Sequence, residues 1–156
     1  MSQNIKTYLQ FNPYYIDALD WNDLMWDRFE VKFEKLSLSL KDILISAKTS
    51  LFIDGVLGQM GLNISQGQKL SRVIRDIILG DVYLGDMINI IQDNLGVDKD
   101  KAKNIASLFI SQLSKEALEE LKKLHTAKFG QREVPPLPKK PEATNNPNII
   151  DLRNNQ

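Results

Sequence analysis

The single histidine, His125, is the side chain with the most obvious potential for acid–base or metal chemistry. A catalytic imidazole needs a nucleophilic or activating partner, and a metal site usually needs a second strong ligand. Neither accompanies His125 in the sequence, where its neighbours are Leu124 and Thr126. We therefore expect His125 at the surface or near a helix end, where a cation suits the helix dipole.

Carboxylates are the second candidate for chemistry, because Asp17, Asp20, Asp23 and Asp27 follow one another at intervals of three and four. Such a group could in principle bind a divalent cation. A calcium-binding loop of the EF-hand type alternates its ligands and has glycine at its sixth position, and the run DALDWNDLMWD does neither. The spacing is that of a solvated helix face, so no metal site is expected.

Other catalytic or cofactor sites are not indicated. The sequence has no cysteine, which excludes disulfides, thiolate metal sites and a cysteine nucleophile. It contains neither a G-x-S-x-G elbow nor a phosphate-binding P-loop. The glycines of GVLGQMG recur at steps of three inside a helical pattern instead of following a strand. We therefore predict no catalytic residue, no cofactor and no enzyme.

A helix-turn-helix pattern in residues 85–109 predicts one alternative function, nucleic-acid binding. Helix 99–113 would be the recognition helix, and its candidate contacts are Lys99, Lys101, Lys103 and Asn104. Gln92 stands where a small residue usually lets the two helices close together. Asp98 and Asp100 place negative charge where phosphates would approach.

The segment 130–156 holds five of the six prolines and almost no periodic apolar content, which predicts a flexible, extended tail. A short terminal motif interrupts its polarity, and its predicted partner-binding residues are Ile149, Ile150, Leu152 and Arg153. Isolated aliphatic side chains on a flexible tail gain nothing from water, so a use in binding is indicated. The motif could add to a sheet edge, occupy a groove of another chain or dock onto its own domain.

Apolar residues at helical spacing predict the elements that would position these groups, and they are densest over residues 65–113. Six helices are expected, at about 13–36, 40–60, 65–80, from 81 or 86 to 95, 98–113 and 115–129. Ser65 with Gln68, Asp98 and Ser114 are predicted caps. A weak internal similarity has an offset of 33 residues, as in Leu62 and Leu95.

The predicted architecture is an all-α compact bundle of five to six helices. An N-terminal arm, residues 1–12, precedes the helical domain, residues 13–129, and the tail follows it. The 156 residues are 42% hydrophobic and 26% charged with zero net charge, which suits a globular protein and steers it toward no charged partner. No signal-peptide pattern and no apolar run of about 20 residues is present, so we expect no membrane span and a cytoplasmic location.

Two runs of the sequence resemble small helical proteins of unknown function from candidate-phyla bacteria. They are L-G-V-D-K-D-K-A-K-N-I-A, from Leu95 to Ala106, and N-I-I-D-L-R-N, from Asn148 to Asn154. The resemblance implies a prokaryotic helical protein with a separate tail motif, and it implies no particular activity.

The leading functional prediction is a non-enzymatic helical adaptor whose tail, together with a groove on the bundle, binds another protein. The alternative is a helix-turn-helix nucleic-acid-binding protein. An uninterrupted basic surface from Lys99 to Lys103 would favour nucleic acid, and an apolar groove would favour a protein partner. The oligomeric state is not predicted by any pattern.

Overall fold

All of the regular secondary structure in the described part of the chain is helical. The structure is a computed structural model and describes Ile5, Leu9, Asn12, Tyr14 and residues 20–130. Its helices are α2 (Asp23–Glu34), α3 (Leu38–Ile45), α4 (Ala47–Met60), α5 (Ile64–Ile78), the short 3-10 helix η2 (Leu84–Asp86), α6 (Met87–Leu95), α7 (Lys99–Gln112) and α8 (Lys115–Phe129). These residues include no strand, which confirms the predicted all-α class.

The first expected helix, at 13–36, is shorter than predicted. Asn22 is the N-cap of α2, and its side-chain oxygen accepts a hydrogen bond from the backbone N–H of Met25 at 3.0 Å. The extended backbone of Asn22 ends any helical path from the preceding residues, because an N-cap residue lies outside helical φ and ψ. The helix therefore begins ten residues later than expected, at Asp23.

The second expected helix, at 40–60, is two helices in the structure. Ser46 has extended backbone angles (φ −88°, ψ 134°), and its hydroxyl accepts from the N–H of Lys48 at 3.1 Å. This cap breaks the path, and α3 and α4 meet at a 54° bend. No single helix in the described part of the chain is long and apolar enough to cross a membrane, and this bent pair passes that test by length and composition alone.

The cap of α5 also differs from the prediction. Asn63, not Ser65, is its N-cap, and a reciprocal pair of 2.9 Å hydrogen bonds joins Asn63 and Gln66 as a capping box. The predicted caps Asp98 and Ser114 are confirmed, with hydrogen bonds of 2.7 and 3.0 Å to backbone N–H groups. Capping residues and left-handed glycines thus decide where the helices of this bundle begin and end.

Two helix pairs in the structure, α4–α5 and α6–α7, are built alike. Gly61 and Gly96 end their first helices with nearly equal angles (φ 63° and 66°, ψ 37° and 34°), and Gly96 lies 35 residues after Gly61. Gln66 donates to the carbonyl of Leu95 at 2.9 Å, and its counterpart 35 residues on, Lys101, donates to that of Met60 at 3.4 Å. The structural offset is therefore 35 residues, and the offset of 33 suggested by the sequence is wrong by two.

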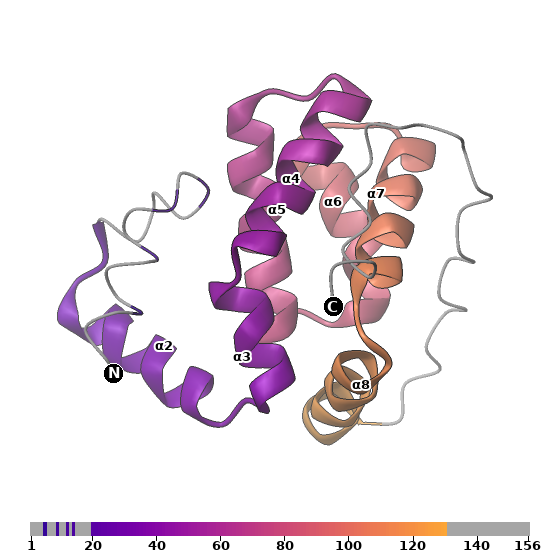
Figure 1. The fold of residues 1–156 in the computed structure, drawn as a ribbon. Coiled ribbons are helices and arrows are strands. Elements are labelled where there is room, and N and C mark those ends of the chain that lie inside the picture. The colour runs from indigo at the N-terminus through magenta and orange to yellow at the C-terminus, as the bar shows by residue number, and fades with distance from the viewer. Residues whose placement is uncertain (1–4, 6–8, 10–11, 13, 15–19, 131–156) are drawn as a thin grey trace.

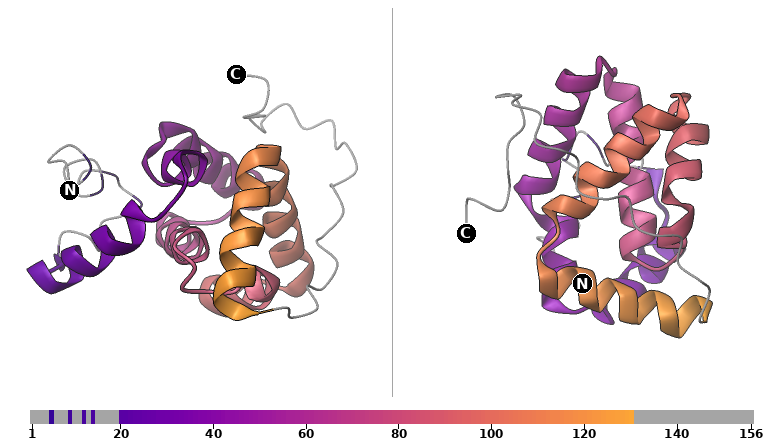
Figure 2. Two further views of the ribbon diagram at one scale, coloured as in Figure 1. Left: turned by 90° about the horizontal axis from the view of Figure 1, so that it is seen from below. Right: turned by 90° about the vertical axis from the view of Figure 1, so that its right-hand side faces the viewer.

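Helix α5 is the centre of the core and contacts α3, α4 and α6. Ile77 on α5 and Ile91 on α6 are fully buried. Helix α8 crosses the end of the bundle and contacts α3, whereas α2 projects from one side (Figures 1 and 2). This crossing brings the start of α8 beside α3, where the groove described below is formed.

The described residues of the predicted arm, together with Tyr14 just after it, pack against the rest of the domain. Leu9 and Tyr14 are buried, and Asn12 donates to the Ser50 hydroxyl at 2.9 Å. The Tyr14 hydroxyl donates to the carboxylate of Asp54 on α4, and Ser71 on α5 donates to the Tyr14 carbonyl. These contacts attach the chain before α2 to α4 and α5.

Candidate functional site

His125 lies near the end of α8, as expected, but the expectation of a surface position is wrong, since only 3% of the residue is exposed. Its Nδ1 accepts the backbone N–H of Leu84 at 3.0 Å, which places the ring proton on Nε2. Nε2 then donates to the carbonyl of Ile77 at 2.8 Å. The imidazole thus joins the end of α5 to η2, and both ring nitrogens are occupied by backbone groups.

The electrostatic setting of His125 also favours a neutral, structural role. Burial lowers its pKa below the usual value, the carbonyl of Ile77 opposes that shift, and the charge of Lys128 lowers the pKa further. The rings of Tyr83 and Phe129 lie 6.1 and 5.4 Å from the imidazole ring. An imidazole enclosed in this way is unsuited to act on a substrate.

The acidic residues described near α2 do not gather into a site. Asp20, Asp23 and Asp27 are exposed, and Asp17 lies outside the described residues. Residues 20–130 and the four described residues before them hold no group of three His, Cys, Asp or Glu side chains placed to bind a metal ion. The neighbouring Trp21 and Trp26 rings pack edge to face, with centroids 4.8 Å apart.

The structure does not bring the predicted nucleic-acid residues into one basic surface. Lys99, Lys103 and Asn104 are exposed, but Lys101 is half-buried and its ammonium donates to the carbonyl of Met60 at 3.4 Å. The exposed carboxylates of Asp98 and Asp100 interrupt the positive charge at the start of α7. Repulsion of phosphate by these carboxylates would offset much of the attraction of two lysines.

The predicted partner-binding residues of the tail, Ile149, Ile150, Leu152 and Arg153, lie outside the described residues. Their assignment stays a prediction. What the structure adds is a surface on the helical domain that suits such residues.

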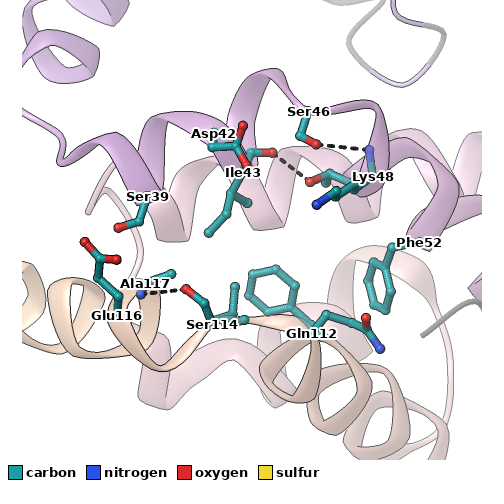
Figure 3. Close-up of a pocket in the computed structure, with 13 residues that line it drawn as sticks. Ser39, Asp42, Ile43, Ser46, Lys48, Phe52, Gln112, Ser114, Glu116 and Ala117 are labelled. Atoms are coloured by element: carbon teal, nitrogen blue, oxygen red, sulfur yellow. Dashed lines mark hydrogen bonds between the residues drawn. The ribbon is translucent and has the colours of Figure 1, made fainter. Parts of the chain in front are cut away.

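A groove of about 300 Å³ lies between the α3–α4 bend and the α7–α8 junction, and we call it the α3–α8 groove (Figure 3). Its apolar residues are Ile43, Phe52, Phe109, Leu113 and Ala117. Its polar residues are Ser39, Asp42, Ser46, Lys48, Thr49, Gln112, Ser114 and Glu116. Figure 3 shows residues 39–52 along one wall and residues 112–117 along the other.

Two breaks in the helices create this groove. Ser46 ends α3 and turns the chain into α4, and Ser114 does the same between α7 and α8. Only the break at Ser114 could be predicted from the sequence, because Ser114 is a predicted cap. The position of one wall opposite the other could not be predicted, because the two walls come from residues far apart in the chain.

The hydroxyl groups at the helix breaks already serve the backbone. Ser46 and Ser114 accept from the N–H groups of Lys48 and Ala117 at 3.1 and 3.0 Å. Thr49 donates to the carbonyl of Ile43 at 2.7 Å. None of these three hydroxyls is paired with a general base, and the lining residues include no histidine or cysteine.

The charged groups of the lining come from both walls. Asp42 and Lys48 belong to the α3–α4 wall, and Glu116 belongs to α8. The buried Phe52, Phe109 and Ala117 form what we call the apolar floor, and the exposed Asp42 and Glu116 with the half-buried Lys48 form the charged rim. A groove that combines apolar and charged groups is suited to hold an amphipathic ligand in one orientation. The arrangement offers binding and offers no activated nucleophile.

Comparisons of the chain with protein-family models, with curated proteins and with solved structures found no match.

Proposed function

We propose that this protein is a non-enzymatic helical interaction domain that binds an aliphatic segment of a protein in the α3–α8 groove. The single observation that carries the proposal is the groove itself, about 300 Å³ with an apolar floor and charges of both signs at the rim. In this proposal aliphatic side chains of the bound segment supply affinity, and the rim charges set its direction.

The dimensions and lining of the groove suit such a segment. Its volume is at the lower end of the roughly 300–1,000 Å³ of small-molecule sites, which leaves room for a few aliphatic side chains. Phe52 and Phe109 lie with ring centroids 6.2 Å apart and are almost fully buried, so only their edges contribute to the floor of the groove. Burial of an aliphatic side chain contributes about 1.5–3 kcal/mol, so two such side chains are enough for a weak, regulated contact.

Nucleic-acid binding remains the alternative prediction, and no observation in the described part of the chain favours it. The ammonium of Lys101 donates to the carbonyl of Met60, and the exposed Asp98 and Asp100 flank Lys99 in the sequence. A protein ligand is therefore the better match to the surface that the fold presents.

The test is selection of peptides from a random displayed library with the full-length protein as bait. Selected peptides should carry two aliphatic residues beside a charged one, and their affinity should fall about tenfold in Leu113→Ala or Ile43→Ala, which removes roughly 1.4 kcal/mol of apolar contact. Both positions are only half-buried, which limits the effect on folding. Leu24→Ala, at an exposed apolar residue of α2, is the matched control. Selected peptides that bind both groove variants as tightly as wild type would contradict the proposal.

A further inference from the structure

We infer that in the free protein the α3–α8 groove is occupied in cis by the chain's own segment Ile149–Arg153. The inference rests on the proposed function and adds the identity of an occupant and a consequence, namely that the protein restrains its own binding site. Three features carry it: the place where the described domain ends, the length of chain that follows, and the pattern of the segment.

Helix α8 begins at the groove and carries the chain away from it. Glu116 and Ala117, in its first turn, line the groove, and the helix ends at Phe129. A helix of 15 residues is about 22 Å long. The tail therefore departs at roughly that distance from the groove.

The connecting chain has the length needed to return. Residues 131–148 separate Gly130 from Ile149, and a chain of 18 residues can span up to about 60 Å, well over the distance to be covered. A tether that can cover the distance to a site raises the effective concentration of the tethered segment there, into the millimolar range for short tethers. A segment with only modest affinity would then fill the groove for most of the time.

The alternation of aliphatic and charged residues in the segment matches the apolar floor and the charged rim of the groove. In an extended conformation alternate side chains point to opposite sides, so Ile150 and Leu152 share one side and Asp151 and Arg153 share the other. The two aliphatic side chains suit the apolar floor. At the rim Asp151 has a cationic counterpart in Lys48, and Arg153 has anionic counterparts in Asp42 and Glu116.

Occupation of the groove in cis lowers the apparent affinity of the protein for other partners. If the segment fills the groove for nine-tenths of the time, the apparent affinity of any competing partner falls about tenfold. The segment thus acts as an intramolecular competitor, and a partner that displaces it also releases Ile149–Arg153.

The first experiment measures binding of a labelled peptide of residues 143–156 to the full-length chain by fluorescence anisotropy. Wild type is compared with Ile150→Asp/Leu152→Asp, whose substitutions lie outside the helical domain. We expect the variant to bind the peptide about tenfold more tightly than wild type. Equal affinities, or no binding to either protein, would overturn occupation in cis. The peptide selection described above would still decide the proposed function, so the two failures are distinguishable.

A charge exchange tests the predicted orientation. Glu116→Arg in the full-length chain should release the segment and raise affinity for a selected peptide whose charged residue has been replaced by alanine. Adding Arg153→Glu to the same chain should restore the wild-type affinity. Glu119→Arg, at an exposed residue of α8 that does not line the groove, is the matched control and should change nothing. The pairing of Arg153 with Glu116 would be contradicted if Arg153→Glu did not restore the wild-type affinity, or if Glu119→Arg raised the affinity as much as Glu116→Arg.

The absence of cysteine allows a direct test of cis docking. A nitroxide on Asn154→Cys should broaden the methyl signals of Ile43, Leu113 and Ala117 within the labelled chain. Mixing labelled chains with isotope-enriched, unlabelled chains should leave those signals sharp. Broadening that occurs only between chains would assign the occupant to a second copy and overturn the inference.

Discussion

Replacing His125 by leucine should destabilise the protein even though leucine is apolar and close to histidine in size. The substitution leaves the backbone N–H of Leu84 buried without its acceptor, which costs about 1–3 kcal/mol. The carbonyl of Ile77 is affected less, because it also accepts the N–H of Gly80 at 3.1 Å. We therefore expect the free energy of unfolding to fall by about 2 kcal/mol. The lost contacts are those that join the end of α5 to η2.

The same contact predicts how stability depends on pH. The folded-state pKa of His125 is below its unfolded value of about 6.5, so the unfolded chain binds more protons in that range and stability rises with pH. The contribution of His125 is complete above about pH 6.5 and is lost as pH falls through the folded pKa. Its slope is at most about 1.4 kcal/mol per pH unit.

Urea unfolding of wild type, His125→Leu and the control Lys122→Ala, at pH 7.5, 6.5 and 5.5, tests both parts of this prediction. Lys122 is exposed on the same helix. Wild type and the control should lose stability between pH 6.5 and 5.5, and His125→Leu should lose less. A leucine variant within about 0.5 kcal/mol of wild type at pH 7.5, or one with the wild-type slope, would refute the reasoning.

Three further predictions concern the caps, the core and the alternative function. Asn63→Ala should cost about 1 kcal/mol in urea unfolding because it removes a capping box, whereas Ser65→Ala should cost less than about 0.5 kcal/mol, and the reverse order would favour Ser65 as the cap. Ile91→Asp should cost several kcal/mol because it buries an unpaired charge in the core, and wild-type thermal stability would contradict the assigned inward face of α6. Changing Lys99, Lys101 and Lys103 together to glutamine should leave duplex DNA binding undetectable, as in wild type. Micromolar wild-type binding at physiological salt, with a slope that flattens by up to about three units in the variant, would instead support the nucleic-acid alternative.

The fold could be predicted best where a capping side chain, alone or with a preceding left-handed glycine, marks the start of a helix. Gly96 and Asp98 allow the start of α7 to be read from the sequence, and Ser114 does so for α8. Asn22 and Ser46 were missed as breaks because the apolar spacing continues across them. Periodicity shows which face of a segment is apolar, but a cap in the middle of that pattern changes the path without changing the spacing.

The candidate site could be predicted only in part. The absence of cysteine and the lone histidine limit the chemistry, but the buried position of His125 depends on Ile77 and Leu84, which approach it only in the folded chain. The groove likewise needs α8 to cross beside α3, and no local pattern encodes that crossing. The burial of His125 and the position of α8 beside α3 depend on tertiary packing, which the periodicity of the sequence does not show.

The central claim, that the α3–α8 groove binds an aliphatic protein segment, is tested most directly by methyl NMR. A selected peptide would be titrated into full-length protein carrying Ile150→Asp/Leu152→Asp, so that the proposed internal competitor is removed. We predict shift changes concentrated at Ile43, Thr49, Leu113 and Ala117, which line the groove. Shift changes that instead map to Leu24, Met25 and Val31, the exposed apolar residues of α2, would contradict the claim.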